Sequence, residues 1–555
     1  MVEFWANSLA AAHQFRPVPS ARWNHETFYS TNFRDTHSTY TDRVAFLDEV
    51  EKFAALHHRI PPRRAKAMDP QHRLLVDLAR EAVQDAGWER RPFDRSTTGV
   101  FVGLSTADYK DMVGARLTAS LLADGSLSAN ANDPELLKAI AEAAKAAIDP
   151  PQSFSMAGSL LNMAPATVSE LLDLGGPSFA VDAACSSALV AMHEAVNHLR
   201  AGSCSAALVG GVFVNLTPNA LVGFSRVGAL SPAGLCRPFD SRADGFVLGE
   251  GGSLAVLRPL DDALEAGDRI YAVINGIGTA NDGKGAGPMT PRAEGQEAAM
   301  RAAYRDARVE PGAIDFLEAH GTGTTVGDRV EMEAVRRLRA KSADRTCYLS
   351  SGKATIGHTL PAAGAAGVLR TALALHHRTV PPQPATIDPH AELPLAEAGL
   401  AGAPGRRPAA GRGQLVRFRR HERARGAERG ARAGGGRRRR GPPVDGAALR
   451  RQRGAAHDVR AKVVGSDRRG RGADTGVGVP DDGQPDPARR AARGDVPHAR
   501  RAGRTPGRRG PRAGRRRNRA AGGGALRERQ PAHPGAALAG LPLSGSGLAA
   551  PGRAA

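Results

Sequence analysis

The chain has 555 residues and a formal net charge of +20. This length allows one large domain with an additional segment, or two to three ordinary domains. The charge is unevenly distributed, because residues 401–555 contain 37 Arg, one Lys and 11 acidic residues, a net of +27, whereas residues 1–400 carry a net of −7. The first 400 residues therefore have the composition of an ordinary, mildly acidic protein, which argues against nucleic-acid binding by that part.

The cysteine content and the apolar runs exclude further classes. The four cysteines have no CxxC spacing, which argues against a disulfide framework and against a zinc site. No apolar run of roughly 18 residues occurs, so no membrane span is predicted. The first residues, MVEFW, lack the basic start and apolar stretch of a secretion signal. We therefore expect a cytoplasmic protein with no membrane partner and no metal.

Helical and extended patterns alternate along the first 400 residues. Amphipathic stretches predict helices, and short apolar runs bounded by turn residues predict buried strands. In chain order these are a helix over 73–86, a strand over 99–103, a helix over 187–200, strands over 206–211 and 272–276, and a helix over 294–307. Strands alternating with helices of this length indicate an α/β fold.

Residues 401–555 differ in kind from the rest. They contain no Ile, Met, Trp, Tyr or Cys and a single Phe, whereas Arg, Gly, Ala and Pro dominate. Such a segment cannot bury enough apolar area to offset its conformational entropy, so we expect a disordered, low-complexity basic tail. An Arg-rich RNA-binding tail is the alternative, but the segment lacks the aromatic residues that stack on bases. We therefore predict no nucleic-acid partner.

One cysteine lies in a setting that suits a nucleophile. Cys185 follows an apolar run in the sequence VDAACSSAL and directly precedes a helical pattern. The partial positive charge of a helix N-terminus lowers a thiol pKa and favours the thiolate. The alternative is a buried structural cysteine, which is the usual role of a lone Cys. Cys185 is thus a candidate nucleophile.

Two histidines are candidates for the same site. His320 lies in the sequence EAHGTGT after an apolar run, where a strand end and a Gly/Thr loop can present an imidazole to a cleft. His358 lies in SGKATIGHT, shortly before an Ala/Gly-rich helical pattern, and Lys353 of that segment can hold a nearby charge. Taken singly, each pattern also fits a surface histidine at a turn.

The three segments together resemble the active-site signatures of β-ketoacyl synthases. That family has a DxACSS segment, an EAHGTGT segment and a KxxIGHxxxAAG segment, and all three occur here in the same order. Further matches include AMDPQHRLL from Ala67, CRPFD from Cys236 and ADGFVLGEG from Ala243. The resemblance covers roughly residues 20–395 and has the style of type I polyketide synthases.

This resemblance implies a fold and a domain division. The family has the thiolase fold, a five-layer αβαβα stack built from two similar halves. We expect a ketosynthase domain over 1–400, with an N-terminal half over about 1–235 and a C-terminal half over about 236–400. Residues 401–555 form the tail.

The resemblance also implies a mechanism. Cys185 would take an acyl chain from the phosphopantetheine arm of an acyl carrier protein and so split the reaction into two steps. His320 and His358 would stabilise the enolate of a decarboxylated malonyl-type extender, and Lys353 would position His320. Thr322 and Thr324 match the residues that hold the pantetheine arm. The family uses no bound cofactor or metal, is usually a homodimer, and works with an acyltransferase in cis or in trans.

The sequence departs from the family at two places. A strand of the type IAIVGMxCRFPG normally precedes the FW pair, and a segment like GVSSFGFGGTNAHVVLE normally follows the last match. Neither occurs in the translated sequence. Residues 407–425, read one base later with permitted codons, allow GPRRAGVSSFGFGGTNAH. We therefore expect an N-terminal truncation and a frameshift between about 395 and 407. The alternative to an active synthase is a catalytically dead fragment without its closing strands.

Overall fold

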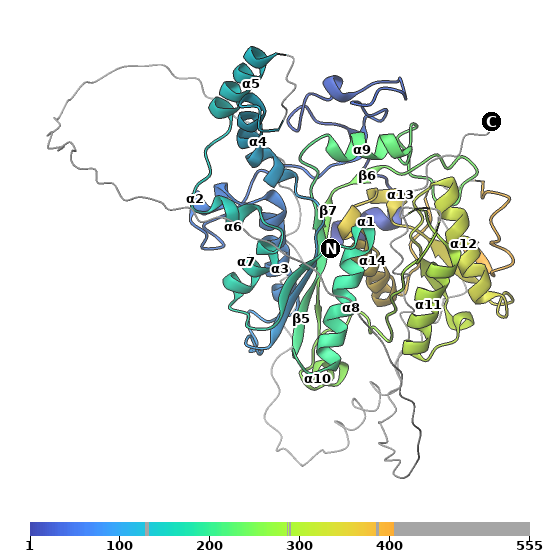
Figure 1. The fold of residues 1–555 in the computed structure, drawn as a ribbon. Coiled ribbons are helices and arrows are strands. Elements are labelled where there is room, and N and C mark those ends of the chain that lie inside the picture. Colours follow the sequence, from blue (N-terminus) through green and yellow to red (C-terminus); the bar gives the residue numbers. More distant parts are fainter. Residues whose placement is uncertain (128–132, 286, 288–289, 385–387, 404–555) are drawn as a thin grey trace, which may run out of the picture. The chain divides into compact units, whose positions relative to one another are not determined.

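The computed structural model describes residues 1–127, 133–285, 287, 290–384 and 388–403 (Figure 1). The predicted disordered tail and the predicted frameshifted segment lie outside these residues, apart from 401–403. The strands are β1 (Arg16–Pro17), β2 (Arg43–Ala45), β3 (Thr98–Gly103), β4 (Ser178–Val181), β5 (Ala206–Phe213), β6 (Leu248–Gly249), β7 (Gly251–Leu257), β8 (Phe316–Glu318), β9 (Cys347–Ser350) and β10 (Leu400–Gly402).

Helices make up most of the remaining regular structure. The α-helices are α1 (Val2–Ala10), α2 (Pro62–Lys66), α3 (Pro70–Asp85), α4 (Asp108–Ala123), α5 (Pro134–Ala147), α6 (Ser155–Ser159), α7 (Met163–Leu172), α8 (Ser187–Arg200), α9 (Asn219–Val227), α10 (Leu260–Glu265), α11 (Ala293–Ala307), α12 (Thr325–Arg339), α13 (Lys353–Ile356) and α14 (Ala363–His377). Short 3-10 turns are His25–Phe28, Ala184–Ser186, Pro311–Ala313 and Leu360–Ala362.

The first sheet has the strand order β4-β3-β5-β7. β3 runs parallel to both β4 and β5, and β7 closes the order antiparallel to β5. β3 and β5 are buried along their whole length, because helices cover both faces of the sheet. One face packs on α3 and α7, and the other packs on α8. Among the described residues, β7 has no neighbour on its outer side, and its residues are half-buried.

The second sheet is shorter and has the order β10-β9-β8, with all strands parallel. Helices α11 and α12 pack on it through an apolar cluster that includes Met300, Leu317 and Val335. α14 lies between the two sheets, since it contacts β5 and β7 of the first sheet and its Arg370 pairs with Glu318 of β8 in the second, and α8 packs beside it. The layers therefore follow the order helix, sheet, helix, sheet, helix, as the sequence analysis predicts.

Most predicted elements are confirmed within one to three residues. α3, α8 and α11 correspond to the three predicted helices, and β3 and β5 correspond to the first two predicted strands. The N-cap of α3 is Asp69, whose side chain accepts the N–H of Gln71, and Pro70 takes the first helical position.

The predicted strand over 272–276 is wrong, since these residues form no strand. A strand requires a neighbour to receive its backbone hydrogen bonds, and no described strand pairs with these residues. Within the described residues, β8 has β9 as its single neighbour. The predicted boundary at residue 400 falls inside β10, because Leu400, Ala401 and Gly402 pair with β9. Among the described residues, no helix is long and apolar enough to cross a membrane.

Candidate active site

A tight turn between β4 and α8 presents Cys185. Ala184, the preceding residue, has a φ of 49°, a left-handed conformation that is strained for a residue with a Cβ. Asp182 accepts the N–H of Ala184, and Ser187 Oγ accepts the N–H of Ala183 at 2.9 Å and donates to Ala184 O at 2.6 Å. These hydrogen bonds fix the backbone of the turn, and the backbone in turn fixes the direction in which the thiol points.

The environment of Cys185 corrects one expectation. Burial raises the pKa of the Cys185 thiol to about 11, and the positive charge of Lys353 acts in the opposite direction. The expected lowering of the pKa by the helix N-terminus is therefore wrong in its direction, because desolvation of the thiolate outweighs the favourable charges. Burial therefore favours the protonated thiol over the thiolate.

His320 follows β8, and its backbone is fixed on two sides. Its N–H donates to Glu331 Oε1 at 2.7 Å, and its carbonyl accepts a hydrogen bond from Lys353 Nζ at 2.6 Å. Burial lowers the pKa of the imidazole well below its usual range, and the charge of Lys353 lowers it further. His320 is therefore neutral and suits a hydrogen-bonding role.

His358 lies against His320 with ring centroids 5.5 Å apart and planes at 86°. Its backbone N–H donates to Val247 O at 2.7 Å, and its Nδ1 accepts the N–H of Leu360 at 3.2 Å. Burial lowers the pKa of His358 well below its usual range, so the ring is neutral. A neutral ring whose Nδ1 accepts a hydrogen bond carries its proton on Nε2. His358 therefore keeps an Nε2–H donor available.

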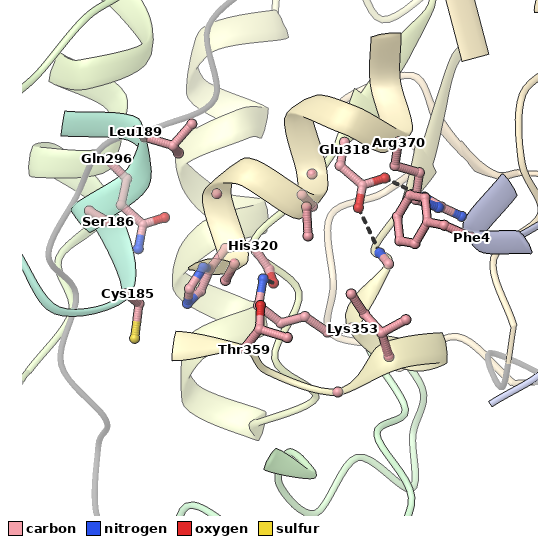
Figure 2. Close-up of a pocket in the computed structure, with 18 residues that line it drawn as sticks. Phe4, Cys185, Ser186, Leu189, Gln296, Glu318, His320, Lys353, Thr359 and Arg370 are labelled. Carbon is pink, nitrogen blue, oxygen red and sulfur yellow. Dashed lines mark hydrogen bonds and ion pairs between the residues drawn. The ribbon is translucent and has the colours of Figure 1, made fainter. Parts of the chain in front are cut away.

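A cavity of about 50 Å³ brings these groups together (Figure 2). Cys185 and Ser186 line one side, and His320, Lys353 and Arg370 line the other. His358 is not a lining residue of this cavity, although Thr359 is, and it joins the site through its contact with His320. The structure thus brings together the four residues that the sequence analysis selected as catalytic.

The two predicted pantetheine-binding residues lie apart from this cavity. The hydroxyls of Thr322 and Thr324 are 3.0 Å from each other, in the loop between β8 and α12. Thr322 is buried, and Thr324 is the N-cap residue of α12. Neither lines the cavity that contains Cys185.

Two carboxylates that the sequence analysis missed hold this loop. Asp328 accepts the N–H groups of Gly323 and Phe239, and Glu331 accepts those of His320 and Gly321. They lie three residues apart on α12, so both reach the loop from one helix face. Burial raises the pKa of Asp328 to about 7. Two acidic residues at this spacing directly after a Gly/Thr loop are the signal that sequence reasoning could have used.

Comparison with known proteins places this site in a family. The N-terminal domain of β-ketoacyl synthases matches residues 2–263, and the C-terminal domain of β-ketoacyl synthases matches residues 271–386. The chain therefore belongs to the β-ketoacyl synthase family, and within it to the ketosynthases of polyketide synthases. The predicted family is confirmed.

Its relatives are large polyketide synthases. The chain is 37% identical to polyketide synthase ThaG of Burkholderia thailandensis over 387 residues, which are 69% of this chain and 6% of that protein. It is 34% identical to polyketide synthase PksL of Bacillus subtilis, covering 68% of this chain and 8% of the relative. The chain thus spans less than a tenth of the length of these two relatives.

Solved structures give the same result for the fold. The ketosynthase from module 6 of the bacillaene synthase of Bacillus subtilis 168 superposes with a TM-score of 0.60 at 32% identity, covering 72% of this chain and 62% of that one. The oxazolomycin ketosynthase domain OzmH KS7 of Streptomyces albus gives a TM-score of 0.62 at 28% identity, covering 72% and 66%. The predicted thiolase fold is confirmed.

Proposed function

We propose that this chain catalyses the decarboxylative Claisen condensation of polyketide or related fatty-acid biosynthesis. One observation carries the proposal: Cys185, His320 and Lys353 line a single cavity, and the ring of His358 lies against that of His320. A thiol nucleophile beside two neutral imidazoles is the set of groups that this condensation requires.

The first half-reaction transfers an acyl group to Cys185. The sulfur attacks the carbonyl carbon of a thioester on the phosphopantetheine arm of an acyl carrier protein. The carbon–sulfur bond to the arm breaks, and the arm leaves as a free thiol with the proton of Cys185. The cavity beside Cys185 and the strained Ala184 turn support this role, because the turn fixes the direction of the thiol and the cavity leaves space for the acyl group.

The second half-reaction forms the new carbon–carbon bond. A malonyl-type extender on the carrier loses carbon dioxide, and its electron pair forms an enolate. His358 Nε2–H and the neutral ring of His320 stabilise the enolate oxygen. The carbanion attacks the acyl carbon on Cys185 and releases the thiolate with a β-ketoacyl product on the carrier. Lys353 positions His320 through its carbonyl, and Thr322 and Thr324 hold the pantetheine arm.

The implied partners follow from these substrates. An acyl carrier protein presents both substrates, and an acyltransferase in cis or in trans loads the extender. No bound cofactor takes part. We also propose a homodimer. β4 lies at the edge of the first sheet, and α7 packs on β4 and contacts α6. Phe154, just before α6, and Met156, within it, are exposed by 38% and 72%.

A second candidate is a catalytically dead ketosynthase fragment. It is favoured by a specific observation, since β8 has one neighbour among the described residues and residues 272–276 form no strand. Such a chain would retain the layers and the Cys185 turn without completing the site.

Acylation mapping separates these candidates. The chain is incubated with an acyl thioester, and the label is located by mass spectrometry before malonyl thioester is added. We expect label on Cys185, none on the other three cysteines, and loss of label in Cys185→Ala. Label that persists in Cys185→Ala would contradict the nucleophile assignment. Acylation without any condensation would favour the fragment.

A further inference from the structure

A buried ion pair lines the active-site cavity. Glu318, the last residue of β8, pairs through Oε2 with Arg370 Nη1 in α14, and the two residues are 5% and 1% exposed. Arg370 also donates to Pro382 O at 3.0 Å. Burying two charges is costly, and such a pair is weak evidence for a stabilising role. The role of the pair is therefore better inferred from the groups that it contacts than from its contribution to the free energy of unfolding.

The second carboxylate oxygen of Glu318 reaches the lysine segment. Oε1 accepts the N–H of Gly352 at 2.6 Å, and Gly352 directly precedes Lys353 (Figure 2). Lys353 Nζ in turn donates to the carbonyl of His320, two residues beyond Glu318. The contacts form a closed ring from Glu318 through Gly352 and Lys353 to His320 and back along the chain.

Little space is left for a side chain at position 352. A Cβ at this position would lie 3.2 Å from Arg370 Cδ and 3.3 Å from Glu318 Oε1. The ion pair thus packs directly on the backbone that carries Lys353. Lys353 is the charged group that acts on the Cys185 thiol, while His320 in the same cavity is neutral.

We propose that the Glu318–Arg370 ion pair is a positioning device, which holds the Gly352–Lys353 backbone so that the lysine ammonium stays on the His320 carbonyl and within electrostatic reach of Cys185. Neither residue acts on the substrate in this scheme. Arg370 neutralises Glu318 and fixes its orientation, and Glu318 holds Gly352. This role of the ion pair rests on the proposed function, since it concerns the reactivity of the proposed nucleophile.

The test measures thiol reactivity, which does not depend on condensation. The rate of Cys185 alkylation by iodoacetamide is followed by mass spectrometry on the full-length chain at one fixed pH below the thiol pKa. The variants are Lys353→Met, Arg370→Met, Arg370→Lys, Glu318→Gln and the double variant Lys353→Met/Arg370→Met. Arg339→Met is the matched control, because Arg339 is also buried but donates to the carbonyls of Ala398, Pro311 and Arg345.

Loss of the lysine charge from the site raises the thiol pKa and slows alkylation. We expect Lys353→Met, Arg370→Met and Glu318→Gln to slow it about threefold or more, as a shift of half a pKa unit does. The double variant should be no slower than Lys353→Met alone. Arg370→Lys should retain a rate near the wild type, and Arg339→Met should leave it unchanged.

Three results would overturn the proposal. They are an unchanged rate in Glu318→Gln and Arg370→Met, multiplicative slowing in the double variant, or no effect of Lys353→Met. If Arg370→Met does not fold, the nearly isosteric Glu318→Gln decides the question. Failure of the proposed function would appear separately, as absent condensation with the alkylation pattern intact.

Discussion

The backbone N–H of Leu360 donates to His358 Nδ1 at 3.2 Å, so the proton of the neutral ring lies on Nε2. Leu360 holds this position with a φ of 43°, in the left-handed region. A strained backbone therefore selects the tautomer of a buried histidine, and the selected tautomer carries the Nε2–H donor that the proposed mechanism assigns to the enolate oxygen.

Replacing His320 or His358 by Ala should separate the two half-reactions. Each variant loses one donor to the enolate oxygen, which typically costs on the order of 10²–10³ in rate. Acylation of Cys185 should remain largely possible, because it forms no enolate. Decarboxylation and condensation of malonyl thioester are measured beside acylation. Normal condensation in both variants would contradict their assignment.

The reactivity of Cys185 should rise steeply with pH. Since burial places its pKa at about 11, the thiolate fraction increases about tenfold per pH unit below that value. Because the histidines are neutral, they add no inflection to the pH–rate profile above about pH 6.5. The pH–rate profile of alkylation tests this, with buried Cys236, whose pKa burial raises to about 12, as internal comparison. A plateau near neutral pH would contradict a thiol whose pKa is raised.

Asp328 should make the folded state less stable as pH rises. Its folded pKa of about 7 lies above the unfolded value of about 3.9, so the folded state binds more protons between these values. The free energy of unfolding therefore loses a contribution as pH increases through this window. Urea unfolding across the window is compared between wild type and Asp328→Asn, with exposed Asp262→Asn as control. The same pH dependence in wild type and Asp328→Asn would exclude Asp328 as its source.

Restoring the reading frame after about residue 395 should complete the second sheet. The restored segment would give β8 a second neighbour and residues 272–276 a partner. Each unpaired buried backbone group costs roughly 1–3 kcal/mol, against a typical total stability of about 5–15 kcal/mol. We expect the corrected gene to give a more stable dimer that condenses malonyl thioester faster than the chain as translated.

Size exclusion and a condensation assay on both versions test this expectation. Hydrogen exchange over 272–276 adds a local readout, since strand formation protects its amides. A compact dimer from the uncorrected gene, with condensation near the corrected rate, would show that the frameshift hypothesis is wrong.

The sequence predicted the parts of this protein that depend on local pattern. α8 and β5 were found within two residues, because periodicity and small turn residues determine them. The cluster of Cys185, His320 and His358 was found by resemblance to the family. The Glu318–Arg370 pair was not found, because its partners are 52 residues apart and meet only through packing.

The predicted strand over 272–276 is wrong because the prediction rests on local pattern alone. Its apolar, β-branched pattern suits a strand, but a strand forms only when it pairs with a neighbouring strand. Local sequence describes the propensity of the segment and does not show whether a neighbour is present. The low pKa expected for Cys185 failed similarly, because burial is set by distant residues.

The outer side of β7, which has no neighbour among the described residues, has a consequence for the behaviour of the chain in a cell. Gly251–Leu257 is a seven-residue, mostly apolar run with no Pro and no charge, and it ends the first sheet. An unpaired edge of this composition is a template for backbone pairing with another chain. High expression should therefore favour inclusion bodies, which the insoluble fraction at high and low expression levels measures.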